Sequence, residues 1–400
     1  MNFLILSVTA GEGHNSTARA IRGELQKLSA DCTVLDTFNY VAPEIGKIIS
    51  EGYLLVTEKA KYAYRIGYGM AEKRRQKDPV ISLGKAALTK ELASYINNED
   101  DFDAIVFTHP FPGILLDAML EHNIIKKKTV GILTDFTFHP YWEYCTRNNY
   151  VAVPDRLLLP QARRKGFRDS QIIPLGIPIN PKFSTSVPKE EARRRLGLYE
   201  HTKTLLLMGG SMGYGNIADN VTAIDKMDLG SDFQMIIVCG NNDSARKETE
   251  KIAKTSRHKM LVTGFVDYVS LLMDASDCIV TKPGGLTTSE SLAKGLPMII
   301  VNPIPGQEER NTEFLLNNGC AAASSKTCPL EECIYQLFTS EKRLAAMKQC
   351  ISEVAKPRSA ENLAHFLIDL AHTPFISDDS PAKPLNEDIV YFDKKGNLYK

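Results

Sequence analysis

The chain lacks an excess of either charge, paired cysteine motifs and long apolar runs. Its 48 Lys and Arg residues balance 48 Asp and Glu residues, so no overall field favours binding to nucleic acid. The 8 cysteines show neither C-x-x-C nor zinc-type His/Cys spacing, which predicts reduced, mostly buried thiols of a cytosolic protein. No apolar run reaches the ~18 residues of a membrane span, and the N-terminus has no basic region of a secretory signal. We therefore expect a cytoplasmic protein that does not cross a membrane.

The sequence does contain a repeated alternation of short apolar runs and helical patterns. At 400 residues the chain exceeds what one core supports, so two domains of roughly 150–200 residues are expected. The alternation predicts an α/β protein with a parallel sheet wrapped by helices in each domain. Residues 176–188 contain three prolines and suit a linker between domains. We predict domains at 1–180 and 181–345, a helical segment at 346–372 that packs back on the first domain, and a polar tail at 373–400.

A glycine turn in the second domain has the pattern of a phosphate loop. The apolar run 278–280 precedes Pro283, Gly284 and Gly285, and a helix can begin at Thr287. Glycines let the backbone approach a ligand, and the free N–H groups of a first helical turn favour an anion such as a diphosphate. The pattern predicts a nucleotide-sugar site.

Glu290 has two interpretations. It is a candidate ligand-binding carboxylate on the helix that follows the glycine turn. Alternatively, Thr287-x-x-Glu290 is a capping box, in which the glutamate binds only a backbone N–H. Gln307 and Glu308 follow the next apolar run, where carboxyl-end loops of an α/β sheet bind ligands, although such residues are also ordinary solvated loop residues.

Each domain opens with a glycine loop after its first strand, and His14 ends the first of these loops. A histidine presented by such a loop suits a general base, because it titrates near neutral pH. The alternative is a histidine that caps the first helix by hydrogen bonding, although Asn15 or Ser16 is the expected cap. A dehydrogenase is a weaker alternative, since Gly11-x-Gly13-x-x-Ser16 lacks the third glycine of the dinucleotide fingerprint, with Asp36 in the place of its ribose-binding acid.

Several motifs together resemble one enzyme family. They are Gly11-Glu12-Gly13-His14, Thr134-Asp135 with His139-Pro140-x-Trp142, Gly176-Ile177-Pro178-Ile179, Gly209-Gly210-Ser211, Lys282-Pro283-Gly284-Gly285, Glu290 and Pro305-Gly306-Gln307-Glu308-x-x-Asn311. In combination, over residues 1 to about 370, they resemble the monogalactosyldiacylglycerol synthase and processive diacylglycerol glucosyltransferase family. They resemble the N-acetylglucosaminyltransferase of peptidoglycan assembly more distantly. Glu12 stands where many relatives have a third glycine.

The resemblance implies a GT-B fold, in which two Rossmann-like domains face each other across a cleft. It also implies inverting, metal-independent transfer of a hexose from a UDP-sugar to a diacylglycerol-type lipid, with no cofactor. Glucose is favoured over galactose by the greater similarity to the processive bacterial branch. The lack of an Asp-x-Asp pair in a matching position agrees with a diphosphate that is held without a metal.

The resemblance also assigns roles to individual residues. His14 would be the base, with Asp135 and His139 on the acceptor side. The nucleotide-sugar site would comprise Gly13, Gly210, Ser211, Lys282, Gly284, Gly285, Thr287, Glu290, Gln307, Glu308 and Asn311. Among these, Glu290 would bind the ribose hydroxyls.

A membrane-facing surface is predicted at residues 57–77, where seven Lys or Arg residues stand against two Glu. Basic residues attract anionic lipid, and interleaved tyrosines suit the interface, which places the protein at the inner face of the cell membrane. The candidate contacts are Tyr64, Arg65, Tyr68, Lys73, Arg74 and Arg75. A second contact is possible around Phe167, at Arg163, Arg164, Lys165 and Arg168. The alternative for 57–77 is a solvated charged helix.

Two other classes of function remain open. One is a different GT-B enzyme, such as a transferase with a polyprenyl-linked acceptor or a UDP-sugar epimerase. The other is a UDP-sugar sensor that regulates a partner.

Overall fold

The computed structural model describes residues 1–9, 12–41, 43, 85–98, 101–210, 213, 216–375, 391–392 and 398–399. It divides into two compact units. The first comprises 1–181, 304–307 and 358–400, and the second comprises 182–303 and 308–357. The predicted α/β class with two parallel sheets is confirmed, since each unit contains a six-stranded sheet.

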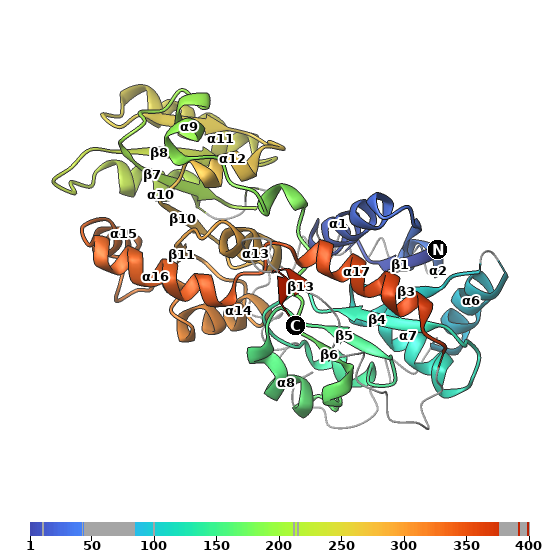
Figure 1. Ribbon diagram of the computed structural model, residues 1–400. Helices are drawn as coiled ribbons and strands as arrows, with labels where there is room; N and C mark the ends of the chain where they lie inside the picture. Colours follow the sequence, from blue (N-terminus) through green and yellow to red (C-terminus); the bar gives the residue numbers. More distant parts are fainter. Residues whose placement is uncertain are drawn as a thin grey trace. The chain divides into compact units, whose positions relative to one another are not determined.

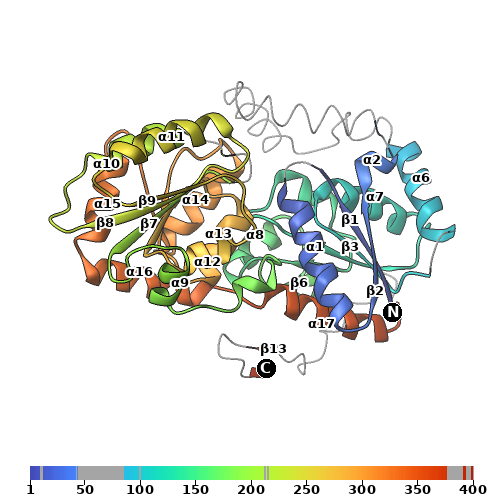
Figure 2. The same ribbon diagram turned by 90° about the horizontal axis from the view of Figure 1, so that it is seen from above.

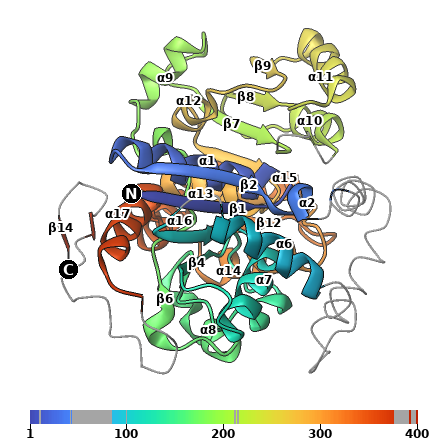
Figure 3. The same cartoon turned by 90° about the vertical axis from the view of Figure 1, so that its right-hand side faces the viewer.

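The first unit has the strand order β2-β1-β3-β4-β5-β6, with every pair parallel. Its strands are β1 (Asn2–Ser7), β2 (Asp31–Asp36), β3 (Ala104–Phe107), β4 (Lys128–Ile132), β5 (Tyr150–Ala152) and β6 (Ile172–Ile173). Its helices are α1 (Glu12–Lys27), α2 (Thr37–Val41), α6 (Lys85–Asn98), α7 (Pro110–Glu121), α8 (Leu159–Arg164) and α17 (Ser359–His372), with 3₁₀ turns η1 (Pro140–Tyr144), η2 (Arg156–Leu158) and η3 (Asp169–Gln171). Figure 3 shows α1 and α7 on opposite sides of β1.

The second unit has the order β12-β11-β10-β7-β8-β9, again parallel throughout. Its strands are β7 (Lys203–Met208), β8 (Phe233–Val238), β9 (Met260–Thr263), β10 (Cys278–Thr281), β11 (Met298–Ile300) and β12 (Ala321–Ala323). The 3₁₀ turn η4 (Pro181–Phe183) leads into it, and its helices are α9 (Lys189–Arg195), α10 (Ile217–Asp225), α11 (Asp243–Thr255), α12 (Val269–Asp274), α13 (Gly285–Ala293), α14 (Gln307–Asn317), α15 (Leu330–Phe338) and α16 (Glu341–Val354). In the tail, β13 (Tyr391–Phe392) pairs with β14 (Leu398–Tyr399) in antiparallel fashion.

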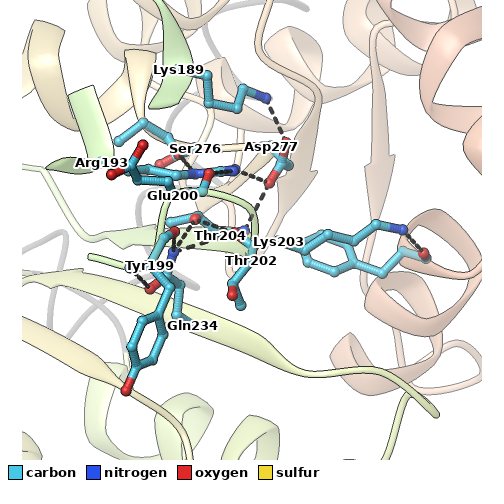
Figure 4. A network of polar contacts seen from close by, with 12 residues as sticks. Lys189, Arg193, Tyr199, Glu200, Thr202, Lys203, Thr204, Gln234, Ser276 and Asp277 are labelled. Atoms are coloured by element: carbon cyan, nitrogen blue, oxygen red, sulfur yellow. Dashed lines mark hydrogen bonds and ion pairs between the residues drawn. The ribbon is translucent and has the colours of Figure 1, made fainter. Parts of the chain in front are cut away.

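A polar network anchors α9 to the amino end of the second sheet (Figure 4). The guanidinium of Arg193 donates to the carboxylate of Asp277 at 2.6 Å and to the carbonyl of Ala275 at 2.9 Å. Asp277 also accepts the backbone N–H of Thr204 at 2.7 Å. Asp277 precedes β10, and Thr204 lies near the start of β7. The network therefore stabilises the amino ends of these strands, whereas ligands bind at the carboxyl ends of the strands in α/β folds.

The segment predicted to be helical at 346–372 contains parts of two helices that belong to different units. It divides between α16, which belongs to the second unit, and α17, which belongs to the first. Figures 1 and 2 show α17 beside α1. The apolar side chains of α17 enter the core that α1 forms with the sheet, and they include the fully buried Leu363, Phe366 and Leu367. Apolar burial of this kind stabilises the unit by about 1.5–3 kcal/mol for each large side chain.

A buried lysine holds the end of α17 on the first unit. The ammonium of Lys128, at the start of β4, donates to the backbone carbonyls of Leu370 at 2.5 Å, Ala371 at 3.2 Å and Thr373. These carbonyls come from the last turn of the helix and the residue after it, so they lack the N–H partner four residues on, although that of Leu370 accepts the N–H of Thr373 at 3.0 Å. Lys128 therefore acts as a C-terminal cap from a distant part of the chain.

We predict that Lys128→Met lowers the free energy of unfolding of the first unit by about 1–3 kcal/mol, because the carbonyls of Leu370, Ala371 and Thr373 lose the ammonium as a donor. The matched control is Lys127→Met, which removes an ion pair with the exposed Asp101 and has little effect. Urea denaturation, with hydrogen exchange of the α17 amides, measures both. Equal stability of the two variants would show that the carbonyls find other partners.

Candidate active site

Each sheet changes the direction of its strand order at one place. In the first unit, β2 lies on one side of β1 and β3 lies on the other. In the second unit, β8 and β10 flank β7 in the same way. In open α/β sheets, ligands bind at the carboxyl ends of the strands at this point, because the two loops diverge there.

His14 follows β1 and lies in the first turn of α1. Its Nδ1 is 2.7 Å from the carbonyl oxygen of Thr108, at the end of β3, and 3.4 Å from Oγ1 of Thr134 after β4. Since a carbonyl oxygen only accepts, Nδ1 carries the hydrogen and Nε2 carries the lone pair. Burial lowers the pKa of His14 to about 4, although the bond to Thr108 raises it. The imidazole is therefore neutral near pH 7, in the tautomer that a base at Nε2 needs.

The predicted start of the first helix is wrong. The helix begins at Glu12, not after Asn15 or Ser16, so His14 belongs to the helix and does not cap it. The Asn15 amide instead accepts from Ser7 Oγ at 2.6 Å and donates to Thr9 Oγ1 at 3.2 Å. It joins the helix to the strand that precedes it.

Asp36 and Gly13 bear on the dehydrogenase alternative. The Asp36 carboxylate accepts the backbone N–H of Thr9 at 2.9 Å and of Asn39 at 3.0 Å, so both of its oxygens are engaged within the protein. It therefore orders the loop after β1 and the start of α2. Gly13 lies in the first turn of α1, and a Cβ built there meets no atom within 4 Å, so the helix surface at this point is open.

A third histidine, His109, joins the site and had not been predicted from the sequence. It follows β3 as the N-cap of α7, and its ring makes an edge contact with His14 at a centroid distance of 4.9 Å and an angle of 82°. Burial lowers the pKa of His109 well below its usual value, and the neighbouring His14 and His139 lower it further. One sequence signal for His109 was available. It follows β3, and β3 is the neighbour of the strand that His14 follows, at the point where the strand order changes.

The structure places Asp135 and His139 on the segment after β4. His139 is the N-cap of η1, and burial lowers its pKa to about 4 with a further contribution from Lys165. The carboxylate of Asp135 accepts from Nε2 of Gln307, which belongs to the same unit. The backbone of Thr108 holds Nδ1 of His14, the position that an orienting carboxylate would take.

In the second unit, the predicted glycine turn and helix are present, but the helix begins earlier. Gly284 is the N-cap and α13 starts at Gly285, so Thr287 is the third residue of the helix. The capping box between Thr287 and Glu290 is therefore wrong. Among the described residues, no side-chain cap is found for the N–H groups of this first turn, and a Cβ built on Gly284 meets no atom within 4 Å. These N–H groups form an accessible anion-binding end with the favourable helix dipole.

Glu290 lies in the second turn of α13 and is half-buried. Burial raises the pKa of its carboxyl to about 8, although Lys182 lowers it. Loss of water outweighs the nearby positive charge at this carboxyl, and a strongly shifted pKa of this kind is typical of functional sites.

Residues of α14, the helix that follows β11, reach the same glycine turn. Lys282 Nζ lies 3.6 Å from the carboxylate of Glu308. Asn311 is fully buried, and its amide donates to the carbonyl of Pro283 at 2.9 Å. Asn311 thus holds the backbone of the glycine turn from the buried side of that turn.

The glycine loop after β7 is described in part. Gly210 has a φ of 75°, and Gly213 has a φ of 63° with a built Cβ only 2.0 Å from the carbonyl oxygen of Cys239. A larger residue at Gly213 would therefore collide with the end of β8. Ser211, also assigned to this loop, lies outside the described residues.

The predicted membrane segment 57–77, with Tyr64, Arg65, Tyr68, Lys73, Arg74 and Arg75, lies outside the described residues. In the second basic cluster, Arg163 forms a two-point ion pair with Asp169 at 2.7 Å for both bonds. Phe167 is only 4% exposed and offers no anchor to a membrane. Within the described ranges, no helix combines the length and apolar character of a membrane span, and no group of three or more His, Cys, Asp or Glu side chains is arranged to bind a metal.

Comparison with known proteins matches nearly the whole chain. Residues 14–179 match the monogalactosyldiacylglycerol (MGDG) synthase family, and residues 204–363 match the glycosyltransferase family 28 C-terminal domain. The processive diacylglycerol beta-glucosyltransferase of Bacillus pumilus is 27% identical over 92% of this chain and 94% of its own. The enzyme of that name from Bacillus subtilis is 26% identical over 90% of this chain and 92% of its own.

Solved structures confirm the GT-B fold. MurG of Acinetobacter baumannii superposes with a TM-score of 0.62 at 16% identity, covering 92% of this chain and 99% of its own. A calicheamicin glycosyltransferase gives 0.57 at 12% identity, with 92% and 98% covered. At these identities the likeness concerns the fold alone.

We predict that Glu290→Gln changes how stability depends on pH. The folded carboxyl has its pKa raised from 4.5 to about 8, so between these values the folded state binds more protons than the unfolded state. Its contribution to stability is therefore present below pH 4.5 and is lost as pH rises towards 8, by up to about 1.4 kcal/mol per pH unit. The Gln variant, permanently neutral, should exceed the wild type in stability at pH 8.

Urea titrations between pH 5 and 8.5 give the difference between the two proteins. Glu313→Gln, on an exposed side chain of α14, is the control and keeps the wild-type slope. Parallel curves for wild type and Glu290→Gln would contradict the raised pKa.

Proposed function

The chain belongs to the monogalactosyldiacylglycerol synthase and glycosyltransferase family 28 enzymes, and on this basis we propose that it transfers a hexose from a UDP-sugar to diacylglycerol or a glycosyl-diacylglycerol. The transfer inverts the anomeric carbon, needs no metal ion and takes place at a membrane surface. Glucose is the favoured sugar, because the similar Bacillus proteins are named as beta-glucosyltransferases.

The observation that carries the proposal is the fixed tautomer of His14. With Nδ1–H held by the Thr108 carbonyl, the Nε2 lone pair is the basic position of the ring. In the proposed reaction, Nε2 takes the proton of the acceptor hydroxyl while the oxygen attacks the anomeric carbon. The bond from that carbon to the diphosphate breaks, and UDP leaves with the electron pair. The low pKa of His14 keeps the base unprotonated before the reaction.

The α13 end supplies the donor half of the proposal. The uncapped N–H groups after Gly284 stabilise the negative charge that develops on the diphosphate, as a preorganised electrostatic site. Glu290 accepts the two ribose hydroxyls, and these donors favour its charged form. Gln307 and Glu308 bind the hydroxyls of the sugar. A sensor of UDP-sugars would need this half alone, whereas the oriented base in the first unit supports catalysis.

Product analysis tests the proposal. The protein is incubated with diacylglycerol in vesicles and with UDP-glucose, UDP-galactose or UDP-N-acetylglucosamine, and the lipids are identified by mass spectrometry and NMR. We expect a β-linked glucosyl-diacylglycerol. A product on another acceptor, an α-linked product or no glycolipid with any of the three donors would overturn the proposal.

We predict that His14→Ala lowers turnover by ~10²–10⁴-fold and leaves UDP affinity nearly unchanged, because a general base acts only in the transition state. Steady-state kinetics and calorimetry with UDP measure the two quantities. His201→Ala, at an exposed position, controls for the loss of a histidine. A fall of less than tenfold would assign the base to another residue, with Asp135 and His139 next to test.

The membrane contact is also a proposal, and it rests on the sequence of 57–77. Each Lys or Arg near an anionic bilayer contributes about 1 kcal/mol, so neutralising Lys73, Arg74, Arg75 and Lys77 removes several kcal/mol if all four reach the headgroups. The loss is larger at low salt, where the Debye length is about 30 Å. Sedimentation with anionic vesicles is the measurement.

The control for this variant carries the same charge change at exposed residues of α11, namely Arg246, Lys247, Lys251 and Lys254. It should retain binding, and the 57–77 variant should remain active on detergent-dispersed acceptor. Undiminished sedimentation of the 57–77 variant would show that the segment is a solvated helix and would move the search to the residues around Phe167.

A further inference from the structure

Two segments of the first unit use the same uncommon device to begin a helix. His109-Pro110-Phe111 and His139-Pro140-Tyr141 both place a histidine at the N-cap and a proline at the first helical position. Proline has no N–H, so the first N–H that needs an acceptor belongs to the residue after it. In both segments the histidine Nδ1 accepts that N–H, at 3.1 Å for Phe111 and 3.2 Å for Tyr141.

This device fixes the tautomer of both histidines. An Nδ1 that accepts carries no hydrogen, so a neutral imidazole must carry it on Nε2. Burial lowers the pKa of both groups and so keeps them neutral. Ser, Thr, Asp and Asn are the preferred N-caps, and any of them would satisfy the same N–H. Capping alone therefore does not require a histidine at either position.

His14 has the opposite arrangement. Its Nδ1 donates to Thr108, so its Nε2 accepts, whereas the Nε2 of His109 donates. The two rings meet edge to face with centroids 4.9 Å apart. The pair thus presents one acceptor and one donor to a molecule at the carboxyl ends of β1 and β3. A bound molecule that matches it has a hydroxyl to donate and a nearby oxygen to accept.

We propose that His109 is a specificity-determining residue for the acceptor, and that its Nε2–H donates to the ester carbonyl next to the hydroxyl that His14 deprotonates. This inference rests on the proposed function. In 1,2-diacylglycerol the reacting hydroxyl is the one donor of the glycerol part, and the ester on the adjacent carbon supplies a carbonyl acceptor. A half-buried ring that caps α7 through Nδ1 directs Nε2 away from that helix, on the side of the ring that can meet a ligand.

The experiment compares two acceptors that differ only at this carbonyl. They are a 1,2-diacylglycerol and the 1,2-dialkylglycerol of equal chain length, presented in the same vesicles with the donor that the wild type uses. The variants are His109→Asn, which keeps an N-cap acceptor, and His109→Phe, which keeps the ring without its nitrogens. His122→Asn, at the exposed opposite end of α7, is the control.

We expect the wild type to prefer the ester, because a site built around a hydrogen bond rejects an analogue that lacks the partner. In His109→Asn, kcat/KM for the ester should fall about 10-fold, through a larger KM, with little change for the ether. His109→Phe should show the same loss of preference, and His122→Asn should behave as the wild type. Melting curves identify any variant that is merely unfolded, and His109→Asn then carries the comparison.

Two results overturn the inference and leave the proposed function standing. One is a wild type with equal kcat/KM for ester and ether. The other is a His109→Asn variant that loses the same factor on both acceptors, which would mean that the ring only supports His14. Absence of transfer by the wild type to any diacylglycerol overturns the proposed function as well, and product analysis of the wild type identifies that case before any variant is made.

Discussion

The hydrogen bond between Nδ1 of His14 and the carbonyl of Thr108 connects the chemistry of the first unit to its fold. It exists because β1 and β3 are parallel neighbours with Leu6 opposite Phe107, so that both strands end at the same level of the sheet. The backbone N–H of Thr108 continues this pairing by donating to Leu6 at 3.1 Å, and its carbonyl is then directed at the first turn of α1. An imidazole placed there has one nitrogen held by the backbone and the other left for a ligand. The orientation of the base thus follows from strand register and needs no acidic side chain.

Burial acts in opposite directions on the candidate groups of the first unit and on that of the second. It lowers the pKa values of His14, His109 and His139 and raises that of Glu290, because in each case removal of water disfavours the charged form. All four groups are therefore held neutral before a substrate is present. In the proposed reaction, charge comes with the substrates. The ribose hydroxyls favour the charged form of Glu290, His14 takes a proton, and further charge develops on the diphosphate as it leaves. A low local dielectric makes the fixed N–H groups of α13 more effective towards such charge.

The sequence predicts the sheets well and the starts of the functional helices poorly. Apolar runs separated by helical periods predict parallel strands, since the spacing of buried residues is a local property. α1 begins at Glu12 and α13 follows a glycine N-cap, so the search for Ser, Thr or Asn placed both starts too late, near Asn15 and Thr287. His109 was missed for a related reason. Its significance comes from its contact with His14, far away in the sequence, and a histidine next to a proline carries little meaning by itself.

The first unit also depends on a segment from the end of the described chain. Ser359, at the start of α17, donates to the carbonyl of Ile177 at 2.7 Å, and Lys128 holds the carbonyls at the other end of the helix. Between these two anchors, α17 covers an apolar stripe of α1 that includes Ile21 and Leu25, and both are fully buried. Until residues 359–372 have been synthesised, that stripe has no partner of this kind. The core of the first unit is therefore completed by a contact between distant parts of the sequence. Contacts of this type form slowly, because closing the intervening chain into a loop costs entropy. The helix that carries His14, α1, needs this contact with α17 to bury its apolar stripe.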